Sequence, residues 1–514
     1  MLALRLLPLV VLAVGVAVAG DPPKRVVAKV TPAADTTVAL GPVDKDGWID
    51  YEHALNERMR GKITPDTNAV VLLFAAIGPK PEGAELHPDF YTWLGRAAPA
   101  DGGYLLPVDK YFAEARGEGS EAFYEFYGEL QKRPWTDKEQ PKVAEWLAVN
   151  ERPLLAVTDA SQRPDYYYPF VSRPRDDEPK LLIGALLSLV QKVRMLAPML
   201  CARAMLRCGT RKYEDAWEDL LAVCRLGRLL SRGASIIESL VGVAIDAIGR
   251  NSTLAFLEHA KLTPKQLAKC RDDLAKLPPM ANMSAKLSLS ERFAFLDVAQ
   301  SIRQYGFHPQ LAYIDFPVPN VPREKAEAVV AKLDWDRMLR RGNAWYDKYE
   351  AALKKPTRAE RAKALADAEA EVTKATEGTD LTKLFKDYTD EKRAETSDAF
   401  GMPLVRALLP AVQKVQEASD RHEQNRRTLE VAFALAAYRA EYDEYPEKLA
   451  DLVPGQSKAI PDDLYNGGKP LIYKRTTAGY EVYSVGLNGK DDGCQLMTDT
   501  PRGDDLGVRM PAKK

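Results

Sequence analysis

The longest helical pattern in the sequence spans residues 181–277, and it constrains the fold more than any other feature. Apolar residues recur there at spacings of three and four positions, which is typical of amphipathic helices. Gly209, Gly233 and the pair Pro278-Pro279 divide the pattern into segments of helix length. The sequence therefore predicts a mainly α protein with a multi-helix body.

One segment of this block has the signature of a helical hairpin. The order Gly209, Tyr213, Ala216, Leu220 resembles the turn and second helix of a tetratricopeptide unit, in which a small residue lets two helices approach closely. The spacing after the glycine is one residue longer than in that family, and no second copy follows. We therefore predict a single helical hairpin in a central region, residues 179–320, rather than a repeat array.

Helix start signals predict further helices on both sides of this hairpin. Asp50 is expected to cap one helix, and Thr263, followed by a proline in the first turn, is expected to cap another. The apolar run 69–77 fits a buried strand or a buried helix, and its alanine content favours a helix. Thr136 is expected to cap a short amphipathic helix. Residues 46–178 are therefore predicted to form an N-terminal helical region.

The first residues carry the pattern of an export signal. Arg5 precedes an apolar run of 14 residues, Leu6 to Ala19, whose last three are Ala17-Val18-Ala19. Such a small-x-small sequence is typical of a signal-peptide cleavage site. An uncleaved membrane anchor is the alternative, but about 20 apolar residues are needed to span a bilayer. We predict a signal peptide over residues 1–19, an extended tail over 20–45, and a mature chain in the periplasm or outside the cell.

The charge balance argues against nucleic acid as a partner. The 514 residues include 72 Lys and Arg against 73 Asp and Glu, a net charge of −1. Binding to phosphate backbones requires a surplus of basic residues.

Five cysteines are too few for a disulfide scaffold. Cys201, Cys208 and Cys224 lie among apolar residues of the helical block, which favours packing as small apolar side chains. A bridge from Cys224 to either of the others is the alternative. No pair has the C-x-x-C spacing of zinc or redox sites.

Residues 321–400 have a different composition, in which acidic and basic residues alternate at helical spacing, as in 358–367. This pattern predicts a charged arm of solvent-exposed helices with i,i+4 ion pairs. A coiled coil for a partner is the alternative, but a sustained heptad pattern is missing.

The most aromatic segment contains Tyr166, Tyr167 and Tyr168 between two prolines. Aromatic faces of this kind bind sugars and peptides. The other interpretation, which we favour, is an extended connector that lies over a helical core.

The C-terminal region, residues 401–514, predicts a small α+β domain made of a long helix and a short antiparallel sheet. A helical pattern over 424–442 ends at Tyr445-Pro446. Strand patterns follow around Tyr473 and over the alternating residues Tyr480, Val482 and Ser484.

These motifs resemble the periplasmic domain of the major pseudopilins of type II secretion. The shared features are a long helix that ends in Tyr-Pro, a Pro-x-Asp motif, a strand with tyrosine, a Ser-x-Gly turn and an Asp-rich end. The likeness covers about 90 residues. It implies a calcium site formed by the Leu487 carbonyl and by side-chain oxygens of Asn488, Asp504 and Asp505. Two further carboxylates, Asp491 and Asp492, lie nearby; alternatively, all these acidic groups merely solvate a hairpin and a tail.

Two differences from that family limit what the resemblance implies. Asn488 stands where the family has an acid, which removes one charge from the site. The family's hydrophobic assembly helix directly precedes its globular domain and is missing here, so we do not expect incorporation into a filament.

Catalytic motifs are sparse. The sequence has no Gly-x-Ser-x-Gly elbow and no phosphate loop, and the start of a zinc-protease motif at His422-Glu423 fails because Arg426 replaces the second histidine. We therefore expect an exported, non-enzymatic cell-envelope protein, a helical scaffold whose C-terminal module contacts protein partners. The alternative is an exported carbohydrate- or peptide-acting hydrolase or binding protein, because a pair of distant carboxylates leaves no local signature.

Overall fold

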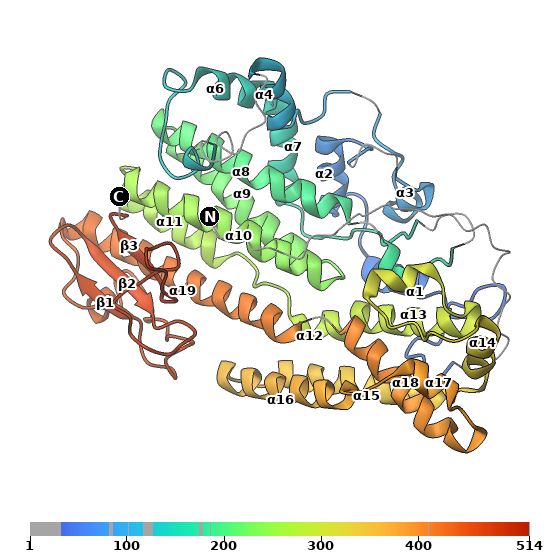
Figure 1. The fold of residues 1–514 in the computed structure, drawn as a ribbon. Coiled ribbons are helices and arrows are strands. Elements are labelled where there is room, and N and C mark those ends of the chain that lie inside the picture. The colour runs from blue at the N-terminus through green and yellow to red at the C-terminus, as the bar shows by residue number, and fades with distance from the viewer. Residues whose placement is uncertain are drawn as a thin grey trace.

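The computed structural model describes residues 32–81, 86–100, 102–116, 127–173, 178–185, 187–409 and 411–512. The protein is mainly helical, with a small three-stranded antiparallel sheet near the C-terminus (Figure 1). The predicted fold class is therefore confirmed. The predicted signal peptide, residues 1–19, and the start of the predicted tail lie outside the described residues.

The region before residue 178 is helical, as predicted. Its described helices are α1 (Tyr51–Arg60), α2 (Ala69–Ile77), α3 (Pro88–Leu94), α4 (Val108–Arg116), α6 (Pro141–Val149) and α7 (Glu151–Ser161). Asp50 caps α1 by accepting the His53 N–H at 2.8 Å. Thr136 does not cap α6, which begins five residues later at Pro141. Thr136 instead forms a turn in which its N–H donates to the Glu139 carboxylate. The proline ring fixes the φ angle of Pro141 near the helical value, so this residue is favoured as the first position of the helix.

The central region folds as the predicted hairpin and continues it. Its elements are a 3₁₀ turn (Leu182–Gly184), α8 (Ser188–Gly209), α9 (Tyr213–Ser231), α10 (Ile236–His259) and α11 (Pro264–Ala275). Thr263 caps α11 in a reciprocal capping box with Gln266. These helices pack with α2, α6 and α7 around a first hydrophobic core. The five cysteines are all buried and free, which confirms the packing interpretation.

Helices α9 and α10 cross with their backbones in direct contact at Gly227 and Gly242. A Cβ atom on Gly242 would lie 2.5 Å from the Gly227 carbonyl oxygen and 2.9 Å from the Ser231 nitrogen. Both obstacles are backbone atoms of a buried helix, so neither can move aside without shifting α9. The absence of side chains at this crossing therefore sets the distance between the two helices.

We expect Gly242→Ala to destabilise the fold by about 1–3 kcal/mol, the usual cost of overpacking a core. Urea denaturation followed by circular dichroism measures this cost. Gly455→Ala is the matched control, because a Cβ there meets no atom within 4 Å. Equal stability of the two variants would show that α9 and α10 can separate freely.

The second group of helices forms its own core together with α1. Its elements are α12 (Met283–Lys286), a π-helical turn (Leu287–Glu291), α13 (Arg292–Tyr305), a 3₁₀ turn (Pro309–Ile314), α14 (Arg323–Lys332), α15 (Trp335–Leu353), α16 (Arg358–Thr376), α17 (Leu381–Lys386), a second 3₁₀ turn (Asp390–Lys392) and α18 (Arg393–Leu408). The prediction of a solvent-exposed arm over 321–400 is wrong for α15 and α18. Trp335, Tyr346 and Phe400 are buried in this second core. Their apolar stripe was hidden in the sequence by charges on the outer faces; α16 keeps the expected i,i+4 pair between Lys363 and Asp367.

The described end of the predicted extended tail is folded. Residues 34–37 form a turn in which Thr36 and Thr37 are buried. The Asn343 side chain on α15 donates to the carbonyls of Asp35 and Thr36 at 3.0 and 2.8 Å. The prediction of an extended tail is therefore wrong for this part, because α15 supplies donors for its backbone.

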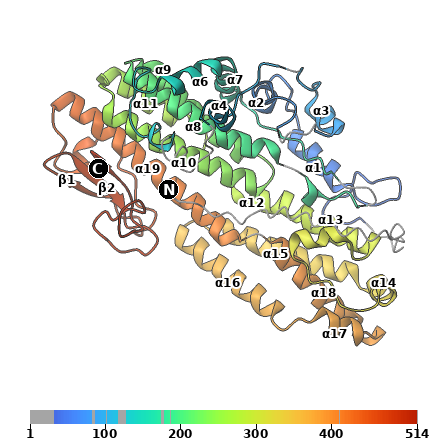
Figure 2. The same cartoon turned by 45° about the horizontal axis from the view of Figure 1, so that its top comes forward.

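The C-terminal module consists of one long helix and the sheet. Its elements are α19 (Val412–Tyr442), a 3₁₀ turn (Leu449–Leu452), β1 (Ile472–Arg475), β2 (Tyr480–Ser484) and β3 (Leu506–Met510). The strands are antiparallel in the order β1-β2-β3, and Val482 pairs with Tyr473 and Val508. Figures 1 and 2 both show α19 extending from the sheet toward the second group of helices. The helix joins all parts of the molecule, since its residues enter the first core, the second core and the core under the sheet.

Among the described helices, α10 alone has the length and apolar composition of a membrane span, which is weak evidence by itself. In the fold α10 packs against α8, α9 and α19 and carries the buried acids Glu238 and Asp246. Its apolar character is that of a core helix.

Candidate functional site

The structure brings two of the four predicted calcium ligands together. The Asn488 N–H donates to Asp504 Oδ2 at 2.7 Å, and the Asn488 side-chain amide donates to Asp504 Oδ1 at 2.6 Å. The same amide donates to Asp492 Oδ2 at 2.7 Å. The Asn488 amide thus bridges two carboxylates in the position where a cation would screen their repulsion.

Asp505 lies beside this cluster. It is 1% exposed, its Oδ2 accepts the Gln495 N–H at 3.0 Å, and its pKa is raised by burial and by the nearby Asp492 charge. The Leu487 side chain is 44% exposed. Within the described ranges, no group of three His, Cys, Asp or Glu residues is arranged to hold a metal ion. The donor chemistry of Asp492 and Asp504 fits a hard cation. Of the predicted ligands, Asn488 and Asp504 are the two in direct contact.

The tyrosines of the aromatic segment face inward. Tyr166, Tyr167 and Tyr168 are 2%, 2% and 4% exposed. Their hydroxyl groups form hydrogen bonds of 3.0–3.1 Å with the side chains of Glu238, Asn56 and Ser188, respectively. The segment is therefore a buried connector, as we favoured, and the alternative of a ligand groove is excluded for these three tyrosines.

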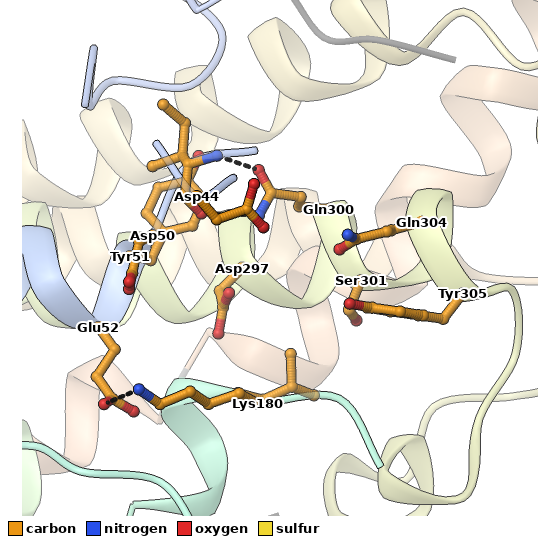
Figure 3. Close-up of a pocket in the computed structure, with 12 residues that line it drawn as sticks. Asp44, Asp50, Tyr51, Glu52, Lys180, Asp297, Gln300, Ser301, Gln304 and Tyr305 are labelled. Carbon is orange, nitrogen blue, oxygen red and sulfur yellow. Dashed lines mark hydrogen bonds and ion pairs between the residues drawn. The ribbon is translucent and has the colours of Figure 1, made fainter. Parts of the chain in front are cut away.

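A cavity of about 160 Å³ lies between α1 and α13 and gathers charged side chains from three parts of the chain. Figure 3 shows Asp50 and Glu52 from α1 and its cap, Lys180 from the connector before α8, and Asp297 from α13. Asp44 and Gln300 complete the rim. The volume is enough for several water molecules or a small polar ligand.

Glu52 is held rigidly at one side of this cavity. Its Oε1 lies 2.7 Å from the Lys180 ammonium, and its Oε2 accepts the Ser172 N–H at 2.8 Å and the Ser172 hydroxyl. The Lys180 pKa is raised: the carboxylates of Glu52 and Asp50 outweigh burial, which acts in the opposite direction. Glu52 is therefore a fixed carboxylate with a permanent cation beside it.

Asp297 has the opposite character. It is 7% exposed, and its Oδ2 accepts the Leu182 N–H at 2.8 Å. Burial, aided by the nearby charges of Glu52 and Asp50, raises the pKa of Asp297 from 3.8 to about 8. A carboxylic acid that stays protonated at neutral pH can donate a proton or a hydrogen bond. The cavity thus holds a neutral acid and a carboxylate together, the pairing that general acid and base catalysis requires.

Ser301 on α13 also lines the cavity, but its hydrogen bonds do not activate it. Its hydroxyl donates to the Val298 carbonyl at 2.8 Å and lies 2.9 Å from His308 Nε2. Burial lowers the pKa of His308 to about 4, so the ring is neutral at pH 7. The tautomer that satisfies both contacts puts the ring proton on Nε2, where it points at the serine oxygen. A nucleophilic serine needs the reverse arrangement.

Sequence reasoning missed this cavity. Glu52, Lys180 and Asp297 are far apart in the chain, and each looks like an ordinary charged residue of a helix or loop. The only local signal is on α13, where Asp297 occupies a position within the apolar run Phe293 to Ile302.

In comparisons with known proteins, no family model matches the chain, and no curated protein or solved structure matches it significantly. Fold and site define a class only: a mainly α-helical protein with a small C-terminal α+β module and a carboxylate cavity between α1 and α13. The resemblance to pseudopilins stays a prediction based on the C-terminal motifs.

Proposed function

We propose that this chain is an exported, non-enzymatic protein of the cell envelope, in which a helical scaffold presents a pseudopilin-like C-terminal interaction module. The observation that carries the proposal is the way α19 anchors this module. Leu429 and Phe433 on one face enter the first core, while Val431, Ala432 and Leu435 enter the core under the sheet. The module is thereby fixed on the body, and residues 487–493 of its loop are exposed.

The same packing supports the expectation that the chain does not assemble as a pseudopilin does. Over residues 429–435, both faces of α19 are covered by this chain itself. A filament subunit would need an apolar helix face for its neighbours.

Location and partners are tested together by cross-linking in intact cells. We expect the mature protein to begin at Gly20, measured by mass spectrometry, and Lys490 in the exposed loop to cross-link to other envelope proteins. A cytoplasmic protein that retains residues 1–19 would contradict export. Cross-links from the helical body but none from Lys490 would contradict the role of the module.

Calcium binding is the metal part of this proposal. At a calcium concentration ten times the Kd, binding would stabilise the module by about 1.4 kcal/mol. We expect millimolar calcium to raise the melting temperature of the full chain and to protect the 486–505 loop from protease. Asp504→Asn should abolish both effects, because it removes the negative charge to which Asn488 now only donates hydrogen bonds.

Asp272→Asn, at an exposed carboxylate on α11, is the matched control and should leave both calcium effects unchanged. A wild-type chain that shows no change in melting or proteolysis up to millimolar calcium would rule out the calcium site.

The second candidate is an exported hydrolase or binding protein for small polar ligands, and the Asp297 cavity favours it. The neutral acid of Asp297 and the carboxylate of Glu52 line one cavity. A hydrolytic activity on an oligosaccharide or peptide substrate that is lost in both Asp297→Asn and Glu52→Gln, with unchanged circular dichroism, would establish this function. Full activity in either variant would exclude it.

A further inference from the structure

A second cavity, of about 230 Å³, lies where the C-terminal ends of α7, α9 and α11 approach one another. Its wall is strongly basic. The charged residues that line it are Arg163, Arg225, Arg228, Arg232, Lys276 and a single carboxylate, Asp273. The cavity is remote in sequence from the C-terminal loop and shares no lining residue with the Asp297 cavity.

The one carboxylate of this wall is committed to other partners. Asp273 Oδ2 accepts the Trp217 indole N–H at 3.0 Å and lies 2.7 Å from the Lys269 ammonium. Neither partner lines the cavity. Asp273 therefore does little to neutralise the arginines.

Three of the guanidinium groups have buried N–H donors without an acceptor. These are Arg163 Nη1, Arg225 Nη1 and Arg228 Nε. Arg225 Nη1 lies 3.5 Å from Glu218 Oε2, which is an ion pair without a hydrogen bond. Arg228 is 4% exposed, so water cannot satisfy its donor from outside. A buried donor without a partner costs about 1–3 kcal/mol, so a shift of these side chains toward an acceptor in the cavity would be favourable.

Basic residues often gather at helix C-termini only to bind the free carbonyls there. Arg232 Nη1 instead donates to the Pro164 carbonyl, in the loop after α7, at 2.6 Å. Arg163 Nη1 and Arg225 Nη1 make no such bond. Binding of a backbone carbonyl therefore accounts for Arg232 but not for Arg163 Nη1 or Arg225 Nη1.

The carboxylate behind the wall, Asp246, has several partners. Arg228 Nη1 lies 2.5 Å from Asp246 Oδ1, and His422 Nδ1 lies 3.1 Å from Asp246 Oδ2. Arg250 is a second buried guanidinium beside this carboxylate, and burial lowers its pKa to about 10. Asp246 thus pairs with Arg228 of the wall but is shared with Arg250, so it compensates Arg228 only in part and leaves Arg163 and Arg225 unaffected.

We propose that this cavity binds the oxoanion of a small phosphorylated molecule, with Arg163 and Arg225 donating to its oxygens and Arg228 forming the floor. Guanidinium groups present paired N–H donors that match phosphate oxygens, and they keep their charge at any physiological pH. The cavity is many times larger than one water molecule, so it can hold the oxoanion together with part of an organic group.

Isothermal titration calorimetry of the full chain with inorganic phosphate, at ionic strength fixed with sodium chloride, tests this proposal. We expect saturable binding of one phosphate per chain. Arg163→Gln and Arg225→Gln should each weaken it about tenfold, which corresponds to the loss of about 1.4 kcal/mol. Arg194→Gln, at an exposed arginine on α8, is the matched control and should bind as the wild type does.

Titration with citrate at the same ionic strength distinguishes a phosphate ligand from a carboxylate ligand. Binding of phosphate but not citrate supports the proposal, and preferential binding of citrate overturns it in favour of a carboxylate ligand. Unchanged phosphate binding in Arg163→Gln/Arg225→Gln, or no saturable binding by the wild type, also overturns it. If a variant loses its helical circular dichroism signal, the wild type alone still tests the proposal. Its melting temperature must be higher in phosphate than in sodium chloride of the same ionic strength.

Discussion

Asp219→Asn should destabilise the helical body by about 3–5 kcal/mol, the cost of removing one partner from a buried ion pair. Asp219 on α9 is 0% exposed and Arg203 on α8 is 3% exposed. Arg203 Nη2 lies 2.6 Å from Asp219 Oδ1, and Arg207 Nη1 lies 2.7 Å from Asp219 Oδ2. The variant leaves the Arg203 charge in the core with a neutral amide in place of its buried carboxylate, and the half-exposed Glu151, 3.1 Å from Arg203 Nη1, remains as its acidic partner.

Burial raises the pKa of Asp219 even though two guanidinium groups oppose it. Desolvation therefore offsets much of the attraction, and replacing the pair by apolar residues should cost less than breaking it. We expect Arg203→Met/Asp219→Leu to be more stable than Asp219→Asn in urea denaturation. Glu218→Gln, at a half-exposed position on the same helix, should change stability by less than about 0.5 kcal/mol. A loss of similar size in Glu218→Gln and Asp219→Asn would refute this role of the buried pair.

The parts of the fold that the sequence predicts well are those where local signals agree. The hairpin of α8 and α9, the caps at Asp50 and Thr263 and the strand around Val482 all combine periodicity with a turn or cap residue. The prediction fails where a long-range contact decides whether a residue is buried. Trp335 and Phe400 become core residues only because α15 and α18 pack against α13.

The same distinction between local signals and long-range contacts explains which site residues could be predicted. Asn488 and Asp504 could be predicted because they belong to ordered motifs within one small module. The Asp297 cavity could not, because its acid owes its character to burial by α1 and the connector, which no local pattern records. The tyrosine segment is predicted as a connector from its flanking prolines, but the sequence could not identify Glu238, Asn56 and Ser188 as the partners of its hydroxyls.

Asp297→Asn should increase stability by an amount that grows with pH. The folded-state pKa of Asp297 is about 8, raised from 3.8 by burial. Below pH 3.8 the acid is protonated in both states and costs nothing. As the pH rises toward 8, the unfolded chain releases this proton while the folded chain retains it, so the wild type loses about 1.4 kcal/mol per pH unit. Above pH 8 both states are ionised and the penalty is constant.

Asparagine removes this penalty and can still accept the Leu182 N–H through its side-chain oxygen. The free energy of unfolding of the variant minus that of the wild type, from urea denaturation at pH 5, 6, 7 and 8, should therefore rise by about 4 kcal/mol across the series. Asp367→Asn, at an exposed acid on α16, should give a difference that does not vary with pH. A flat series for Asp297→Asn would mean that Asp297 is ionised in the folded chain at neutral pH. The cavity would then contain only carboxylates, and the acid that the hydrolase candidate needs would be missing.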